Sequence, residues 1–173
     1  NAQALTGINY FNFLNRFDTN NDNFTDVTLQ NRLSVFNKWE FQRAEYRKAS
    51  VAVRYVYEDR WGGELQWTRH HRGSDQIYGE SIYTNRAELI GNYQLPVKTQ
   101  KVFFDISYNY HLQDSYYGII KYYASQHVAF GQLRWDKKIK KHDLLMGLPF
   151  RFMYYDDNTV GTGSEDSSNQ PAR

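Results

Sequence analysis

Apolar and polar positions alternate with a period of two residues along most of this chain. Between Val27 and Phe41 the odd-numbered positions are mostly apolar, whereas the even-numbered positions include Arg32, Lys38 and Glu40. A period of two places one class of side chain on each face of a β-strand. The alternation predicts an all-β chain of seven antiparallel, up-and-down strands, near residues 8–17, 27–41, 49–58, 81–95, 102–112, 127–135 and 144–155.

The two faces of these strands differ in charge. In the five strongest strands every charged residue falls on one face, and the opposite face carries Leu, Val, Ala and Ile in the middle with Trp, Tyr and Phe near the ends. An aliphatic band between aromatic girdles is typical of the outer surface of a transmembrane β-barrel. A soluble β-sandwich also alternates, so alternation alone leaves both folds open. In the barrel, the following charges are expected to face the lumen: Arg32, Arg54, Arg86, Glu88, Asp105 and Arg151.

The connections between the predicted strands favour the barrel. Short polar stretches at 42–48, 96–101 and 136–143 alternate with longer ones at 59–80 and 113–126. Membrane barrels show this asymmetry, with short periplasmic turns and long extracellular loops. Seven strands cannot close such a barrel, and an open sheet edge cannot face lipid. We therefore expect residues 1–159 to form part of a larger barrel, and residues 160–173 to be a polar, disordered tail.

The composition argues against several classes of function. The 173 residues carry a net charge of +2 and no cysteine, while aromatic residues make up 17% of the chain and no long apolar run occurs. This balance argues against a nucleic-acid partner, a disulfide framework and a transmembrane helix. No Ser-His-Asp set, paired carboxylates or phosphate loop stands out, so we expect a protein that is not an enzyme.

The stretch FDTNNDNFTD holds a candidate metal site. It places oxygen-bearing side chains at alternating positions, as the first nine positions of an EF-hand loop do, and Ca²⁺ prefers oxygen ligands. The sixth position is Asn23 rather than Gly, and the twelfth is Leu29, which cannot supply the bidentate carboxylate. A loop of Asx turns explains the same residues without a metal. The candidate calcium ligands are Asp18, Asn20, Asp22 and Asp26.

Two predicted loops contain side chains suited to a large amphipathic ligand. Tryptophan can stack on the flat face of such a ligand, and Arg or His can engage its charged groups. The structural alternative is a hairpin that extends above the membrane, with tyrosines forming the outer girdle. The candidates are Arg60, Trp61, Trp67, His70, His71, Tyr116, Tyr117, Tyr122 and Tyr123.

Several stretches resemble TonB-dependent outer-membrane receptors of the Bacteroidetes type. They are FDTNNDNFTDVTLQNRLSVFNKW, VRYVYEDRWGG, YGESIYTNRAELIGNYQLP, QHVAFGQLRWDK and YYDDNT. The resemblance covers most of the chain and is strongest to the group related to vitamin B12 (cobalamin) receptors, with haem and iron-chelate (siderophore) receptors next. It implies a bacterial outer-membrane transporter with a 22-stranded barrel, a plug domain and uptake powered by the TonB complex. It also implies extracellular loops ordered by calcium.

A second class of function fits part of the same pattern. A soluble or surface-exposed, calcium-dependent all-β binding module would have the Asp/Asn loop and the alternation, but it would need a partner layer for its apolar face. A small outer-membrane enzyme barrel would need an eighth strand and an acid–base pair that the sequence does not offer.

Overall fold

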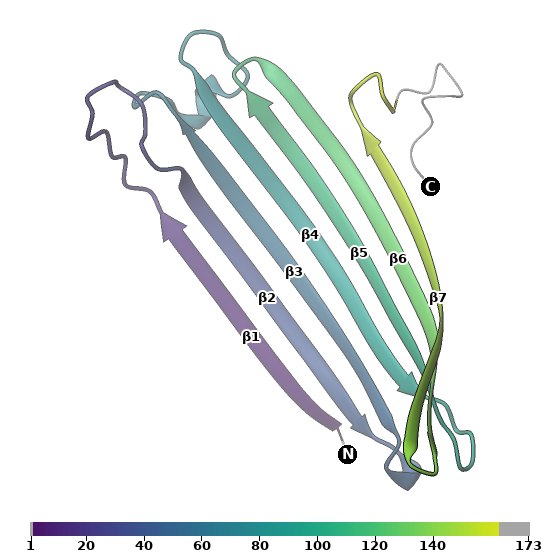
Figure 1. The fold of residues 1–173 in the computed structure, drawn as a ribbon. Coiled ribbons are helices and arrows are strands. Elements are labelled where there is room, and N and C mark those ends of the chain that lie inside the picture. The colour runs from purple at the N-terminus through teal and green to yellow at the C-terminus, as the bar shows by residue number, and fades with distance from the viewer. Residues whose placement is uncertain (1, 163–173) are drawn as a thin grey trace.

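Seven antiparallel β-strands form one sheet in the computed structural model, which describes residues 2–162 (Figure 1). Two single-turn 3₁₀ segments, η1 (Ala44–Tyr46) and η2 (Arg69–His71), lie in connections. The strands follow one another across the sheet in chain order, each paired with the next. They are β1 (Ala2–Phe13), β2 (Leu29–Gln42), β3 (Lys48–Gly63), β4 (Gly79–Gln94), β5 (Lys101–Tyr117), β6 (Ile120–Ile139) and β7 (His142–Asp157).

The register keeps the two predicted faces intact across the sheet. Val35 pairs with Tyr55, Tyr55 with Ala87, and Ala87 with Tyr110, all on the side that we call the apolar face. Arg54 pairs with Glu88 on the opposite side, the charged face. The prediction of an all-β, antiparallel, up-and-down sheet is confirmed. The sheet is open, since β1 and β7 each pair on one side only within the described residues.

Several strand boundaries differ from the prediction, most of all at β1 and at the connection between β5 and β6. The first strand was expected at 8–17, but β1 begins at Ala2 and ends at Phe13, because it pairs along β2 as far as Phe41. The prediction of a long loop at 113–126 was wrong: β5 and β6 continue through it and meet at a turn of Gly118 and Ile119. Residues 163–173 of the expected polar tail lie outside the described residues.

The sheet is a single layer with few buried residues. Only five hydrophobic residues are buried among those described, whereas Val53, Leu89 and Ile106 of the apolar face are exposed. No second sheet or helix of the described chain covers the aliphatic middle of that face, and residues 64–78, which include η2, contact it only at one end. Within residues 2–162 there is also no helix with the length and apolar character needed to span a membrane.

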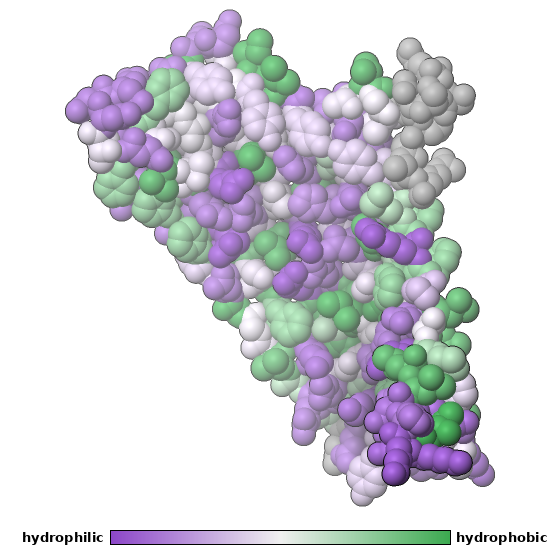
Figure 2. All heavy atoms as spheres, viewed as in Figure 1, coloured by the Kyte–Doolittle hydropathy of each residue, from purple (hydrophilic) through white to green (hydrophobic). Residues whose placement is uncertain are grey.

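The two ends of the sheet carry different connections, which Figure 1 separates clearly. Residues 14–28 and 64–78 lie at one end with the β5–β6 turn, and we call this the long-loop end. Residues 43–47, 95–100 and 140–141 lie at the other, the short-turn end. Figure 2 shows hydrophilic side chains gathered at the turn between β6 and β7 and in patches across the sheet.

Candidate functional site

The β1–β2 loop (residues 14–28) and the β3–β4 loop (residues 64–78) are joined at the long-loop end. The N–H of Leu65 donates to the carbonyl of Asn23 at 2.9 Å, and the N–H of Thr25 donates to the carbonyl of Gly63 at 2.9 Å. The side-chain amides of Asn23 and Gln66 also bond to each other, at 3.1 and 3.2 Å. The two loops therefore form one continuous structure, which we call the joined cap.

Tryptophan side chains hold the joined cap against β3. Trp67 is only 1% exposed, and its ring centroid lies 5.0 Å from that of Trp61. Its ring also lies directly against Gly79, where a Cβ would collide with the indole. The guanidinium of Arg16 lies 4.9 Å from the Trp61 ring and donates to the carbonyls of Leu65 and Trp67 at 2.6 and 3.1 Å. Stacking, cation–π contact and hydrogen bonds act together here.

Two arginines of the β3–β4 loop pair with carboxylates on the apolar face. Asp59 and Asp114 occupy positions on that face beyond the aliphatic band, level with Tyr83 in the register. Arg69 forms an ion pair with buried Asp59. Arg72 approaches Asp114 within 3.1 Å.

Arg72 is the most completely held cation of the joined cap. Its guanidinium carbon lies 4.3 Å from the Tyr83 ring and 4.5 Å from the Tyr116 ring. It also donates to the Ser81 hydroxyl at 2.9 Å and to the carbonyl of Asp114 at 2.9 Å. This role of Arg72 was not predicted from the sequence, although an acid on an otherwise apolar face signals a cationic partner.

The candidate ligand-binding residues from the sequence are spread over both faces. Tyr116 and Tyr123 lie on the apolar face, where Lys121 lies 6.0 and 5.7 Å from their rings. Arg60, Tyr117 and Tyr122 lie on the charged face, and the Tyr122 hydroxyl bonds to that of Tyr155 at 2.6 Å. Trp61 and Trp67 pack on each other, so Trp67 presents no open ring.

The two histidines of the joined cap have different surroundings. The Nδ1 atom of His71 accepts from the N–H of Thr68 at 3.1 Å, while His70 is exposed at η2. Within residues 2–162 no group of three or more His, Cys, Asp or Glu side chains is placed to hold a metal ion.

The carboxylates of the β1–β2 loop bind the loop's own backbone. Asp18 accepts from the N–H groups of Asp22 and Asn23 at 3.1 and 3.0 Å, and Asp22 accepts from that of Phe24 at 2.8 Å. Asn20 donates its side-chain amide to Asp22 at 2.9 Å. The donor set suits Ca²⁺, but as placed these side chains form a series of Asx turns rather than a cage.

Asp26, the last of the candidate calcium ligands, is bonded to Thr19. It accepts hydrogen bonds from the Thr19 hydroxyl at 2.6 Å and from the Thr19 N–H at 2.8 Å. These two bonds favour the ionised form, so they lower the pKa of Asp26 below its ordinary value of 3.8.

The charged face carries networks of paired side chains. Glu88 lies between Arg54 at 2.7 Å and Arg86 at 2.5 Å, and it also accepts from Asn109. Arg134 approaches Asp105 at 3.2 Å, and Arg32 approaches Glu58 at 4.0 Å. Arg151 lies on the same face without an ion pair among the described residues.

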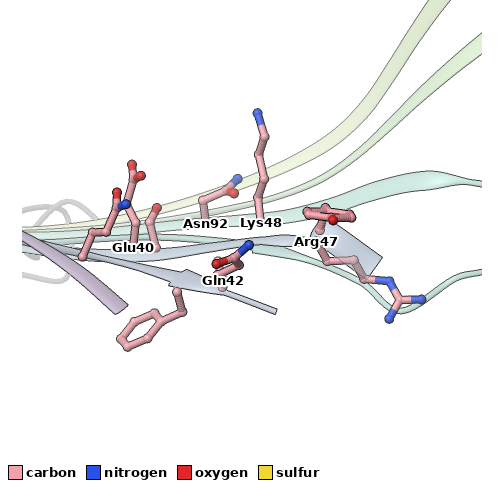
Figure 3. A pocket seen from close by; sticks show the side chains of 10 residues that line it. Glu40, Gln42, Arg47, Lys48 and Asn92 are labelled. Atoms are coloured by element: carbon pink, nitrogen blue, oxygen red, sulfur yellow. The ribbon is translucent and has the colours of Figure 1, made fainter. Parts of the chain in front are cut away.

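A polar hollow of about 550 Å³ lies on the charged face at the short-turn end. Figure 3 shows Glu40, Lys48 and Asn92 standing on one side of the sheet there, while Arg47 leads away from it at the turn. The hollow lies at the opposite end from the joined cap.

Comparison with known proteins gives no relative. No protein-family model, curated protein or solved structure matches this chain. The two faces of the sheet and the joined cap therefore provide the evidence about function.

Proposed function

We propose that this chain forms part of the barrel wall of a TonB-dependent receptor in the bacterial outer membrane. One observation carries the proposal: the apolar face is uncharged through the middle of seven strands and remains exposed, without a covering layer in the described chain. Lipid is the environment in which such a face is stable. The paired charges of the opposite face then line a polar lumen, as barrel interiors do.

The aromatic side chains support the same placement. Tyr55, Tyr108 and Tyr110 precede the joined cap on the apolar face, and Trp39, Phe41 and Tyr93 lie toward the short-turn end. Aromatic belts occupy both membrane interfaces in barrels. The long-loop end is then extracellular and the short-turn end periplasmic.

In this proposal the joined cap takes part in capturing a large, scarce nutrient, first of all a cobalamin and otherwise haem or an iron chelate. The plug domain and the TonB complex would supply gating and energy. The part played by this chain is binding and enclosure rather than covalent chemistry.

Detergent dependence and fractionation test the membrane placement. We expect the chain to sediment with outer membranes and to require detergent for a monodisperse state, since its apolar face must be covered. A monomer that is well dispersed without detergent would contradict the membrane placement and favour a soluble binding module.

Ligand binding is tested separately in the receptor that contains this chain. We expect cyanocobalamin to bind in preference to haemin or ferric chelates, and Tyr117→Ala to weaken that binding because its side chain lies on the charged face at the long-loop end. Tyr46→Ala, at the short-turn end, is the matched control and should bind as the unmodified protein does. Equal binding by both variants would show that this part of the long-loop end does not contact the ligand.

We also propose that the β1–β2 loop takes up a calcium ion, which would regather Asp18, Asn20, Asp22 and Asp26 around one point. Calorimetry with Ca²⁺ should give heat with the unmodified chain and none with Asp18→Ala, Asp22→Ala. Identical traces would contradict the calcium proposal, and the Asx turns would then be sufficient to explain these residues.

A further inference from the structure

A groove runs along the apolar face near the short-turn end. It encloses about 480 Å³, within the roughly 300–1,000 Å³ typical of small-molecule sites. Small residues at Ala49 and Gly91 form its floor, and larger side chains border them in the register, with Phe41 beside Ala49 and Ile106 beside Gly91. The groove arises because small residues alternate with large ones across neighbouring strands.

Arg43 stands at the end of this groove that adjoins the β2–β3 turn. Its guanidinium carbon lies 3.8 Å from the centroid of the Tyr93 ring. Its two terminal nitrogens donate to the Tyr93 hydroxyl and to the carbonyl of Gln94, both at 2.6 Å. The cation is therefore fixed in position by an aromatic face and two acceptors.

Arg43 has no carboxylate partner within 4.0 Å among residues 2–162. Arginines 54, 86, 69 and 72 all have one. A guanidinium has five N–H donors, and the two bonds of Arg43 leave three free. Those donors suit the oxygens of a phosphate, which arginine binds through charge-assisted hydrogen bonds.

The short-turn end, where the groove mouth lies, carries an excess of basic residues. The stretches 43–48, 95–101 and 136–143, which comprise the three short turns and the strand ends beside them, contain nine Lys and Arg residues against three Asp and Glu. The two long loops, 14–28 and 64–78, contain three against five. The basic residues of the turns are Arg43, Arg47, Lys48, Lys98, Lys101, Lys137, Lys138, Lys140 and Lys141.

We propose that this groove binds one acyl chain of an anionic glycerophospholipid, with its phosphate on Arg43. The apolar walls match a hydrocarbon chain, and the fixed, unpaired cation at the mouth matches the headgroup. The surrounding basic turns raise the local concentration of anionic lipid. This inference rests on the proposed membrane placement of the apolar face.

Fluorescence quenching by brominated lipids tests the site. Trp39 pairs with Val51, which lines the groove, so a bromine in an acyl chain held there quenches its emission. The receptor that contains this chain would be reconstituted in phosphatidylcholine vesicles that contain increasing amounts of acyl-brominated phosphatidylglycerol. The difference between the unmodified chain and Trp39→Phe isolates the contribution of Trp39.

We expect half-maximal quenching of Trp39 at a brominated phosphatidylglycerol fraction about fivefold lower than with brominated phosphatidylcholine. Arg43→Gln should abolish this preference. Gly91→Leu should reduce quenching by both lipids, because a Cβ there would lie 2.8 Å from Cγ1 of Ile106 and the side chain would fill the groove. Lys121→Gln, a cation at the opposite end, should match the unmodified chain.

The outcomes separate the two proposals. Quenching by both lipids without a preference, or a preference that survives Arg43→Gln, would overturn the lipid site and leave the membrane placement intact. Competition by inorganic phosphate at equal strength would make Arg43 a free anion site and would also overturn it. Absence of quenching by any brominated lipid would instead contradict the membrane placement.

Discussion

The long-loop end and the short-turn end of this sheet are ordered in different ways. At the long-loop end, Trp67 is 1% exposed and Arg72 lies between two tyrosines, so side chains tie the loops to the strands. At the short-turn end, Tyr46 is 87% exposed, and both Glu45 and Tyr46 adopt positive φ. Strand pairing and single contacts such as that of Arg43 with Tyr93 close those turns, and no aromatic side chain buried as fully as Trp67 anchors them among the described residues.

The difference follows from loop length. A loop of fifteen residues loses considerable backbone entropy when it is fixed, so it needs its own anchoring contacts. A turn of five residues between paired strands has far less freedom to lose. A recognition surface gains affinity when it is ordered before the ligand binds. The anchored long-loop end is therefore better suited to ligand binding than the short-turn end. At the short-turn end, Arg43 keeps donors free for the headgroup proposed above.

The largest expected effect comes from removing the buried indole. Trp67→Ala should lower the free energy of unfolding by about 3–5 kcal/mol, because it deletes a large buried side chain and opens a cavity beside Gly79. Denaturant unfolding of the chain in detergent micelles measures this change.

Tyr46→Ala serves as the control from the other end. Its side chain is exposed, so the free energy of unfolding should stay within about 0.5 kcal/mol. Similar losses for the two variants would mean that the ends are not ordered in different ways.

A smaller loss is expected from the cation between the tyrosines. Arg72→Gln removes the ion pair to Asp114 and the contacts with Tyr83 and Tyr116. We expect a loss of about 2 kcal/mol, below the value for a fully buried pair because Asp114 is 33% exposed. The β3–β4 loop should then become sensitive to chymotrypsin at Trp67. A loop that stays resistant would show that Arg72 does not anchor it.

The short-turn end should respond in the opposite direction. Tyr46→Gly removes a side chain from a left-handed backbone position (φ 56°), which relieves about 1–2 kcal/mol of strain. The added freedom of glycine in the unfolded chain offsets about 0.5–1 kcal/mol. Thermal unfolding should therefore show a net gain of about 0.5 kcal/mol. Ala44→Gly in the same turn, which lacks positive φ, should only destabilise; a gain there would contradict the strain argument.

The faces of the sheet were predictable because they depend on local alternation. Val27 to Phe41 alternates with a period of two, and the register that results keeps Val35, Tyr55 and Ala87 on one side. Strand ends were less predictable, since pairing with a neighbour decides them. Ala2 belongs to β1 because Phe41 lies opposite it, although the residues near Ala2 have no strong pattern.

The joined cap could not be derived from the sequence. Arg72 and Asp114 are 42 residues apart, and their contact exists only because β4 and β5 bring Ser81 beside Tyr116. The stretch 113–126 was predicted to be a loop, yet its tyrosines belong to β5 and β6, which continue to the turn at Gly118 and Ile119. Asp59 and Asp114 break the apolar pattern at the level where the cap begins.

The smallest effect concerns a loop that bonds to itself. Two bonds from Thr19 lower the pKa of Asp26, so the stabilisation by the carboxylate is present above its ordinary pKa of 3.8 and is lost as the pH falls through the lowered folded pKa. Thr19→Val removes the hydroxyl bond and should raise the pKa of Asp26 toward 3.8, as an NMR titration of its carboxyl carbon would record. Thr68→Val, in the other long loop and not bonded to Asp26, should leave that titration unchanged. If Thr19→Val also leaves the pKa of Asp26 unchanged, Thr19 does not order the β1–β2 loop. The contacts between the β1–β2 loop and the β3–β4 loop would then order it, so both long loops would be ordered by contacts between different parts of the chain.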